Sequence, residues 1–129
     1  MANILLIDDD RDFHEIVSLF LSNTPHKITC ASSGQLGINI AAQNPPDLII
    51  LDIAMPGMDG TETCEKLRAL PNAGKTHIMI MSVHSKGELR SGICTGCLDA
   101  AVSYITKPVD MNVFITAVDN ALAQEPVSD

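Results

Sequence analysis

Residues 4–9 read Ile4-Leu5-Leu6-Ile7-Asp8-Asp9, a continuous apolar run that stops abruptly at two acids. A short apolar run without polar alternation is typical of a β-strand that is buried on both faces. Similar runs occur at Leu48–Leu51, directly before Asp52, and at Ile78–Met81, directly before Ser82. Each run is four residues long, far short of the about 20 apolar residues that cross a membrane.

Segments with helical periodicity alternate with these runs, and the pattern predicts five strands and five helices. The expected strands are Ile4–Ile7, His26–Ala31, Asp47–Leu51, Thr76–Met81 and Ala100–Ile105. The expected helices include Arg11–Leu21, one capped by Ser32-Ser33 and ended by Asn44-Pro45-Pro46, and a last one from Val109 to Ala123.

Apolar residues three and four positions apart mark the expected buried faces of these helices. They are Phe13, Ile16, Val17 and Phe20 in the first helix, Leu36, Ile40 and Ala41 in the second, Cys64 and Leu67 in the third, Leu89 and Ile93 in the fourth, and Met111, Phe114, Ile115, Val118 and Leu122 in the last.

This alternation predicts an α/β fold of the doubly wound (βα)5 type. Parallel strands need crossover connections, and right-handed crossovers place helices on both faces of the sheet. We therefore expect a five-stranded parallel sheet covered by helices on both sides.

Length and charge limit what the chain can do. Its 129 residues, with a mass of 13.8 kDa, make one domain of ordinary size. Acidic residues outnumber basic ones by 16 to 8, and the resulting net charge of −8 repels nucleic-acid phosphates and anionic lipid. We expect neither a nucleic acid nor a membrane as partner. The N-terminus Met1-Ala2-Asn3-Ile4 has no basic leader, which indicates a cytoplasmic location.

Polar and charged residues follow the predicted strands at the edge where ligands bind in such sheets. They are Asp8 and Asp9 after the first strand, Asp52 after the third, Ser82 after the fourth, and Thr106, Lys107 and Pro108 after the fifth. Neighbouring carboxylates repel one another unless a cation joins them, and an all-oxygen set of this kind suits Mg²⁺.

A metal ion, an ammonium group and a hydroxyl donor are the parts that stabilise a transferring phosphoryl group. A carboxylate can accept that group as an aspartyl phosphate. Asp52 begins a turn-rich loop and is expected at the centre of the sheet, so it is the candidate acceptor.

Four motifs in order resemble the receiver domain of bacterial two-component response regulators, over essentially the whole chain. They are Ile4-Leu5-Leu6-Ile7-Asp8-Asp9, Asp52-Ile53-Ala54-Met55-Pro56-Gly57-Met58-Asp59-Gly60, Met81-Ser82, and Tyr104-Ile105-Thr106-Lys107-Pro108. The fold implied by this resemblance is flavodoxin-like, or more closely CheY-like.

The resemblance implies that Asp52 is the phosphoacceptor and that a sensor histidine kinase or a histidine phosphotransfer protein is the donor. It also implies that Asp9 and Asp52 ligate Mg²⁺ directly, together with the backbone carbonyl of Ala54. Asp8 is expected to act mostly through water.

The resemblance further implies a switch. Ser82 and Lys107 would hold phosphoryl oxygens, and Ser82 would move toward the phosphate. Tyr104 would then turn inward and alter the surface that a downstream effector protein reads. The Lys107-Pro108 peptide bond is often cis in the family.

Some positions depart from the family pattern. Val83 stands where a small alanine is commonest, which predicts tighter access to the phosphoryl group. Ala54 and His84 occupy two variable positions that tune the phosphate lifetime. The stretch 96–104 is about three residues longer than is usual in the family. This excess lies in the usual partner surface, so the switch at Tyr104 is expected to differ from the family pattern.

The domain is expected over residues 1–125, with a C-terminal tail over 126–129. The 21 residues after Pro108 suffice for the last helix, so the resemblance implies a stand-alone receiver like the CheY-like chemotaxis regulators. Such a protein signals by binding, and its only catalysis would be its own phosphorylation and dephosphorylation.

Two alternatives use the same residues differently. A haloacid-dehalogenase-type phosphatase also has an aspartyl nucleophile, and Asp8-Asp9-Asp10 contains its D-x-D pattern, but Asp12 stands where those enzymes want Thr or Val. A phosphorylation-independent interaction domain on the same fold is the second alternative.

Other reactive residues have simpler interpretations. Asp10 and Asp12 are expected to be helix caps or surface charges. The pair Cys94 and Cys97 closes a predicted helix, which is the wrong place for a redox motif. The histidines are scattered, and only His84 is expected near the site.

Overall fold

A computed structural model describes residues 2–52, 60–71, 76–82, 102–106 and 110–123. The strands are β1 (Asn3–Ile7), β2 (Lys27–Ala31), β3 (Leu48–Asp52), β4 (His77–Ser82) and β5 (Val102–Thr106), and the described helices are α1 (Arg11–Leu21), α2 (Gly34–Gln43), α3 (Gly60–Arg68) and α6 (Met111–Ala123). The expected fourth helix, with Leu89 and Ile93, and the pair Cys94 and Cys97 lie outside the described residues.

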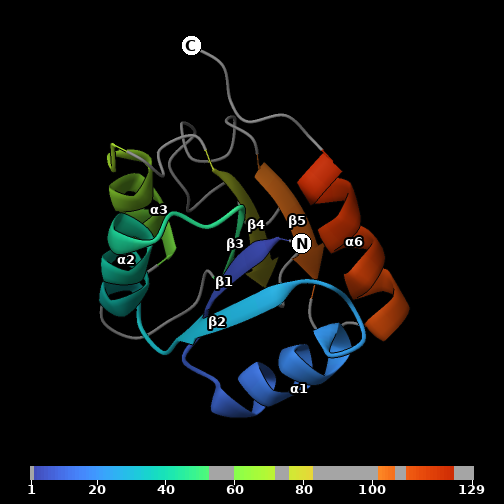
Figure 1. The fold of residues 1–129 in the computed structure, drawn as a ribbon. Helices are drawn as coiled ribbons and strands as arrows, with labels where there is room; N and C mark the ends of the chain where they lie inside the picture. The colour runs from blue at the N-terminus through green and yellow to red at the C-terminus, as the bar shows by residue number, and fades with distance from the viewer. Residues whose placement is uncertain (1, 53–59, 72–75, 83–101, 107–109, 124–129) are drawn as a thin grey trace.

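The five strands form one parallel sheet in the order β2-β1-β3-β4-β5. Figure 1 shows α2 and α3 on one side of this sheet and α1 and α6 on the other. The doubly wound α/β fold predicted from the alternating pattern is therefore confirmed. Because β3 occupies the middle of the sheet, its last residue, Asp52, lies at the centre of one edge.

Three strands end one residue later than predicted. Asp52, Ser82 and Thr106 are the last residues of β3, β4 and β5, rather than the first residues after them. Main-chain pairing explains the difference, since Asp52 pairs with Met81 and Ser82 pairs with Thr106. Hydrogen bonds of a ladder use backbone groups, so the sheet continues past the point where the apolar side chains stop.

Successive strand side chains alternate between two buried clusters. One cluster joins Leu5, Ile7, Ile49, Leu51, Ile78 and Ile80 to Ile38, Ala41, Cys64 and Leu67 of α2 and α3. The other joins Ile4, Leu6, Leu48, Ile50, Met79 and Met81 to Phe13, Val17, Leu21, Phe114, Val118 and Ala121 of α1 and α6. The central strands are therefore buried on both faces, as their unbroken apolar runs indicate.

Three residues predicted on buried helix faces are exposed instead. Ile16 is 42% exposed, Leu36 is 43% exposed and Met111 is 46% exposed. In α1 the buried stripe runs through Phe13 and Val17, four residues apart. Ile16 lies about 100° from Val17 around the helix, so it flanks the stripe and faces solvent.

The last helix begins two residues later than expected, at Met111. Asp110 precedes it, and its Oδ1 accepts the backbone N–H of Asn112 at 2.7 Å. This contact satisfies an N–H group that lacks a partner within the helix. Met111 is thus at the exposed start of α6, and its buried face is made by Phe114, Val118 and Ala121.

The buried face of α2 passes through glycine rather than through Leu36. Gly34, Gly37, Ile38 and Ala41 are its buried residues. A Cβ atom built on Gly37 would overlap the side chain of Ile7, with Cγ1 only 2.5 Å away. The absence of a side chain at Gly37 therefore lets α2 lie directly against β1, the strand that leads to Asp8.

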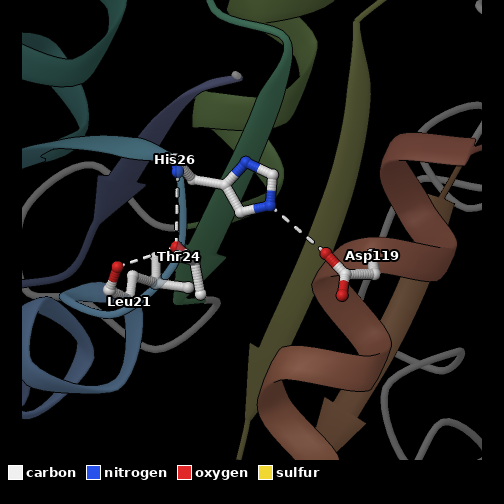
Figure 2. A network of polar contacts seen from close by, with 4 residues as sticks. All are labelled: Leu21, Thr24, His26 and Asp119. Atoms are coloured by element: carbon white, nitrogen blue, oxygen red, sulfur yellow. Dashed lines mark hydrogen bonds and ion pairs between the residues drawn. The ribbon is translucent and has the colours of Figure 1, made fainter.

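Two contacts hold α6 beside the start of β2 and the end of α1. The rings of Phe20 and Phe114 are 5.7 Å apart. Figure 2 shows His26 Nε2 contacting Asp119 Oδ1 at 3.2 Å, while the His26 backbone N–H donates to Thr24 Oγ1 at 3.3 Å. Thr24 Oγ1 in turn donates to the carbonyl oxygen of Leu21 at 2.7 Å.

Among the described residues, no helix combines the length and the apolar character that crossing a membrane requires.

Replacing Gly37 by alanine is predicted to destabilise the fold, although alanine is the better helix former. Helix propensity alone would stabilise Gly37→Ala by about 0.5–1 kcal/mol. Overlap with the fully buried Ile7 side chain should reverse the sign, because overpacking a core costs about 1–3 kcal/mol. Urea unfolding measures the difference in free energy of unfolding.

A matched control is Ala42→Gly, since Ala42 lies on the exposed side of α2. This variant measures the propensity difference in the same helix without a packing change. If Gly37→Ala is stabilising by the amount that Ala42→Gly is destabilising, the close approach of α2 to β1 is wrong.

Candidate functional site

Three carboxylates lie together at the edge of the sheet where β1 and β3 end. Asp8 and Asp9 follow β1, and Asp52 is the last residue of β3, which pairs directly with β1. One oxygen from each of Asp8, Asp9 and Asp52 lies within 4.8 Å of the others. The prediction that these three acids converge is confirmed.

Burial differs sharply among the three acids. Asp8 is 0% exposed and Asp52 is 7% exposed, whereas Asp9 is exposed. The acidic cluster (Asp8, Asp9 and Asp52) therefore has a buried floor and one side open to solvent. Such a site can hold an ion that keeps part of its water shell.

Backbone hydrogen bonds fix Asp8 at the floor of the acidic cluster. Its N–H donates to the carbonyl oxygen of Ala31 in β2 at 3.0 Å. Its Oδ1 accepts the N–H of Asp10 at 2.9 Å. Asp10 in turn caps α1, because its Oδ1 accepts the N–H groups of Asp12 and Phe13. The expectation that Asp10 is a helix cap is confirmed.

The acidic cluster fits a hard divalent cation. All three side chains offer only oxygen, which is the ligand type that Mg²⁺ and Ca²⁺ take. Mg²⁺ usually binds one or two carboxylates and retains several waters, which matches an open side at Asp9. Carboxylates so close together repel one another, and a bound cation would offset that repulsion.

The other predicted site residues are only partly described. Ser82 ends β4 and pairs with Thr106 at the end of β5, at the same sheet edge as Asp52. Tyr104 lies within β5 and pairs with Ile80. Several predicted residues lie outside the described part of the chain, namely Ala54, Val83, His84, Lys107 and Pro108.

His14 is near the acidic cluster, and the expectation that only His84 would be there was wrong. The Nε2 atom of His14 lies 2.5 Å from the backbone carbonyl oxygen of Asp8. The only sequence signal for this contact is that His14 lies one helical turn after the cap Asp10. A backbone acceptor leaves no trace in the sequence, so the contact emerges only from the structure.

A family model described as the response regulator receiver domain matches residues 4–119. The chain belongs to this family. Receiver domains are the phosphoacceptor modules of two-component signalling, and this receiver domain carries its acidic cluster at the carboxyl edge of the sheet.

Curated relatives support the family. AfsQ1, a transcriptional regulatory protein of Streptomyces coelicolor, is 30% identical over 113 residues, which are 88% of this chain and 48% of AfsQ1. The nitrate/nitrite response regulator NarL of Escherichia coli is 34% identical over 128 residues, which are 98% of this chain and 57% of NarL. The chain thus spans about half the length of these relatives.

Solved structures share the fold. The chemotaxis protein CheY4 of Vibrio cholerae superposes with a TM-score of 0.83 at 22% identity, over 94% of this chain and 98% of CheY4. A response regulator of Chloroflexus aurantiacus gives 0.82 at 26% identity, over 95% and 98% of the two chains. The receiver domain of PA1611 from Pseudomonas aeruginosa, solved with a magnesium ion in its cleft, gives 0.83 at 20% identity, over 95% and 98% of the chains.

Mg²⁺ is expected to raise the melting temperature of this receiver domain. An ion that binds only the folded state at ten times its dissociation constant stabilises that state by about 1.4 kcal/mol. For a domain of this size the melting temperature should rise by about 3–6 °C. Differential scanning calorimetry in millimolar MgCl₂ measures the change.

The matched variants are Asp9→Asn in the acidic cluster and Asp12→Asn outside it, both at exposed positions. We expect Asp9→Asn to reduce the Mg²⁺-dependent rise and Asp12→Asn to retain it. Equal rises in the two variants would place the ion elsewhere.

Proposed function

We propose that Asp52 accepts a phosphoryl group from a sensor histidine kinase or a histidine phosphotransfer protein, in a reaction that depends on Mg²⁺. The observation that carries this proposal is the meeting of the Asp8, Asp9 and Asp52 oxygens within 4.8 Å at one sheet edge. The proposed receiver domain comprises residues 1–125, with 126–129 as a tail, and works in the cytoplasm.

Position favours Asp52 as the acceptor among the three acids. Asp8 is fully buried, and one of its carboxylate oxygens accepts the N–H of Asp10. Asp9 is exposed in the loop after β1. Asp52 ends the central strand and keeps a small exposed fraction, so it combines a fixed position with access from solvent.

The chemistry is a transfer from nitrogen to oxygen. A carboxylate oxygen of Asp52 attacks phosphorus, the phosphorus–nitrogen bond of a phosphohistidine breaks, and the released imidazole takes up a proton. Bound Mg²⁺ supplies positive charge next to the transferring group. Asp9 and Asp52 would ligate the ion directly, together with the backbone carbonyl of Ala54, and Asp8 would act mostly through water.

Residues at the ends of the next two strands would stabilise the product and report it. We propose that Ser82 and Lys107 hold phosphoryl oxygens, and that Ser82 and Tyr104 change position on phosphorylation. Ser82 ends β4 beside Asp52, which is the position such a contact requires. Val83, His84 and the Lys107-Pro108 bond are proposed to set access and lifetime of the phosphate.

The proposed output is phosphorylation-dependent binding of an effector protein. The net charge of −8 on this chain disfavours direct contact of the receiver domain with a nucleic acid or an anionic membrane. We propose a stand-alone receiver as the first candidate, since the chain covers 98% of CheY4. AfsQ1 and NarL, which are about twice as long, support control of an attached output domain as the second candidate.

Immunoblotting of the native protein separates these two forms. A band near 13.8 kDa is expected for the stand-alone receiver, and a band about twice that size would favour the attached output domain.

A haloacid-dehalogenase-type phosphatase fits the observed geometry less well. The D-x-D pattern would place Asp8 and Asp10 together in the site, but Asp10 caps α1 and Asp9 joins the acidic cluster instead. We also propose that any catalysis by this chain is limited to its own phosphorylation and dephosphorylation.

Intact mass spectrometry tests the phosphoacceptor. After incubation with acetyl phosphate and Mg²⁺, we expect the wild-type chain to gain the mass of one phosphoryl group. Asp52→Asn should gain none, because an amide is not a nucleophile at neutral pH, whereas Asp12→Asn should behave like the wild type. Chelation of Mg²⁺ should abolish the gain.

An unlabelled wild-type chain would support the phosphorylation-independent interaction domain. Labelling that persists in Asp52→Asn but disappears in Asp8→Asn would support the phosphatase.

A further inference from the structure

Chemistry fixes the direction of the hydrogen bond between His14 and Asp8. The acceptor is a backbone carbonyl oxygen, which cannot donate, so His14 Nε2 must carry a proton and donate it. The atoms are 2.5 Å apart, and the His14 side chain is half-buried. This is a short hydrogen bond between α1 and the end of β1, and it uses a main-chain group of a residue in the acidic cluster.

The carbonyl of Asp8 accepts this hydrogen bond in a buried setting. Asp8 is 0% exposed and lies one residue beyond the paired part of β1, which ends at Ile7. A buried backbone carbonyl without a partner is costly, so most are hydrogen-bonded. His14 supplies a donor to this buried carbonyl.

This hydrogen bond fixes more than one residue. The carbonyl of Asp8 and the amide nitrogen of Asp9 belong to the same rigid peptide plane. With the Asp8 N–H held by Ala31 and its Oδ1 held by Asp10, the His14 contact sets the orientation of that plane. The plane in turn determines where the exposed Asp9 side chain departs from the chain.

We propose that His14 is a positioning residue that holds the Asp8–Asp9 peptide in the orientation a divalent cation needs. This inference rests on the cation site of the proposed function. His14 touches neither cation nor phosphoryl group, and it acts through Asp8. Without the His14 contact the Asp8–Asp9 peptide would be held less firmly, so cation binding would have to restrict it further and affinity would fall.

Two substitutions separate the donor from the bulk of the ring. His14→Gln places an amide N–H at a reach similar to that of Nε2 and carries no titratable proton. His14→Leu fills similar space and has no donor. Leu19→Ala is the matched control on the same helix, because Leu19 is 68% exposed and lies more than one turn further from the acidic cluster along α1.

Isothermal titration calorimetry with Mn²⁺ as the probe measures the dissociation constant of each variant. Groups that orient metal ligands are typically worth 10- to 100-fold in affinity, so we expect about tenfold weaker binding in His14→Leu and a change below about threefold in His14→Gln and Leu19→Ala. Thermal unfolding without metal shows whether each variant is fully folded at the titration temperature.

Each result decides the matter. Equal Mn²⁺ affinity in His14→Leu and the wild type would overturn the inference while leaving the cation site intact, as would equal weakening in His14→Gln and His14→Leu. A wild-type chain that binds no Mn²⁺ would overturn the inference together with the proposed function.

Nuclear magnetic resonance gives a readout that needs no metal. The ring nitrogen signals of His14 should report a protonated Nε2 in the folded chain. A neutral ring protonated only on Nδ1 would overturn the inference, because that form cannot donate to Asp8.

Discussion

Main-chain pairing between β1 and β3 is the constraint on which the acidic cluster depends. Neighbouring parallel strands end at the same edge, so Asp8 and Asp52 are brought together by backbone hydrogen bonds and not by any attraction of their own. Their charges oppose this arrangement, and the apolar residues that bury both faces of the strands stabilise it. The acidic cluster therefore holds carboxylates that repel one another, and binding a cation would offset this repulsion.

The sheet was predictable because its strands are buried on both faces. Apolar runs such as Ile4–Ile7 and Leu48–Leu51 are too short for buried helices and too uniformly apolar for half-exposed strands, and the acids after them fall at one edge by topology alone. The buried faces of the helices were less predictable. Helical periodicity identifies a stripe of apolar residues but does not show which residue faces the sheet most directly. Leu36 has the right spacing, yet Gly37 takes the position against β1 because only a residue without a side chain fits beside Ile7.

The site, too, was predictable in some features and not in others. Convergence of Asp8, Asp9 and Asp52 followed from where the strands end, and the cap at Asp10 followed from its place before α1. The partner of His14 did not follow, because its acceptor is a main-chain carbonyl that every residue possesses. Exact strand ends were missed for a related reason, since the ladder pairs backbone groups regardless of which side chain they carry.

Helix α1 contacts both the loop that carries Asp8 and Asp9 and the C-terminal helix α6. At its start, the Asp10 N–H donates to the Asp8 carboxylate and His14 donates to the Asp8 carbonyl. Near its far end, Phe20 packs against Phe114 of α6. Eleven residues of α-helix form a stiff rod about 16 Å long. Helix α1 is therefore a stiff connection between the loop that carries Asp8 and Asp9 and the C-terminal helix.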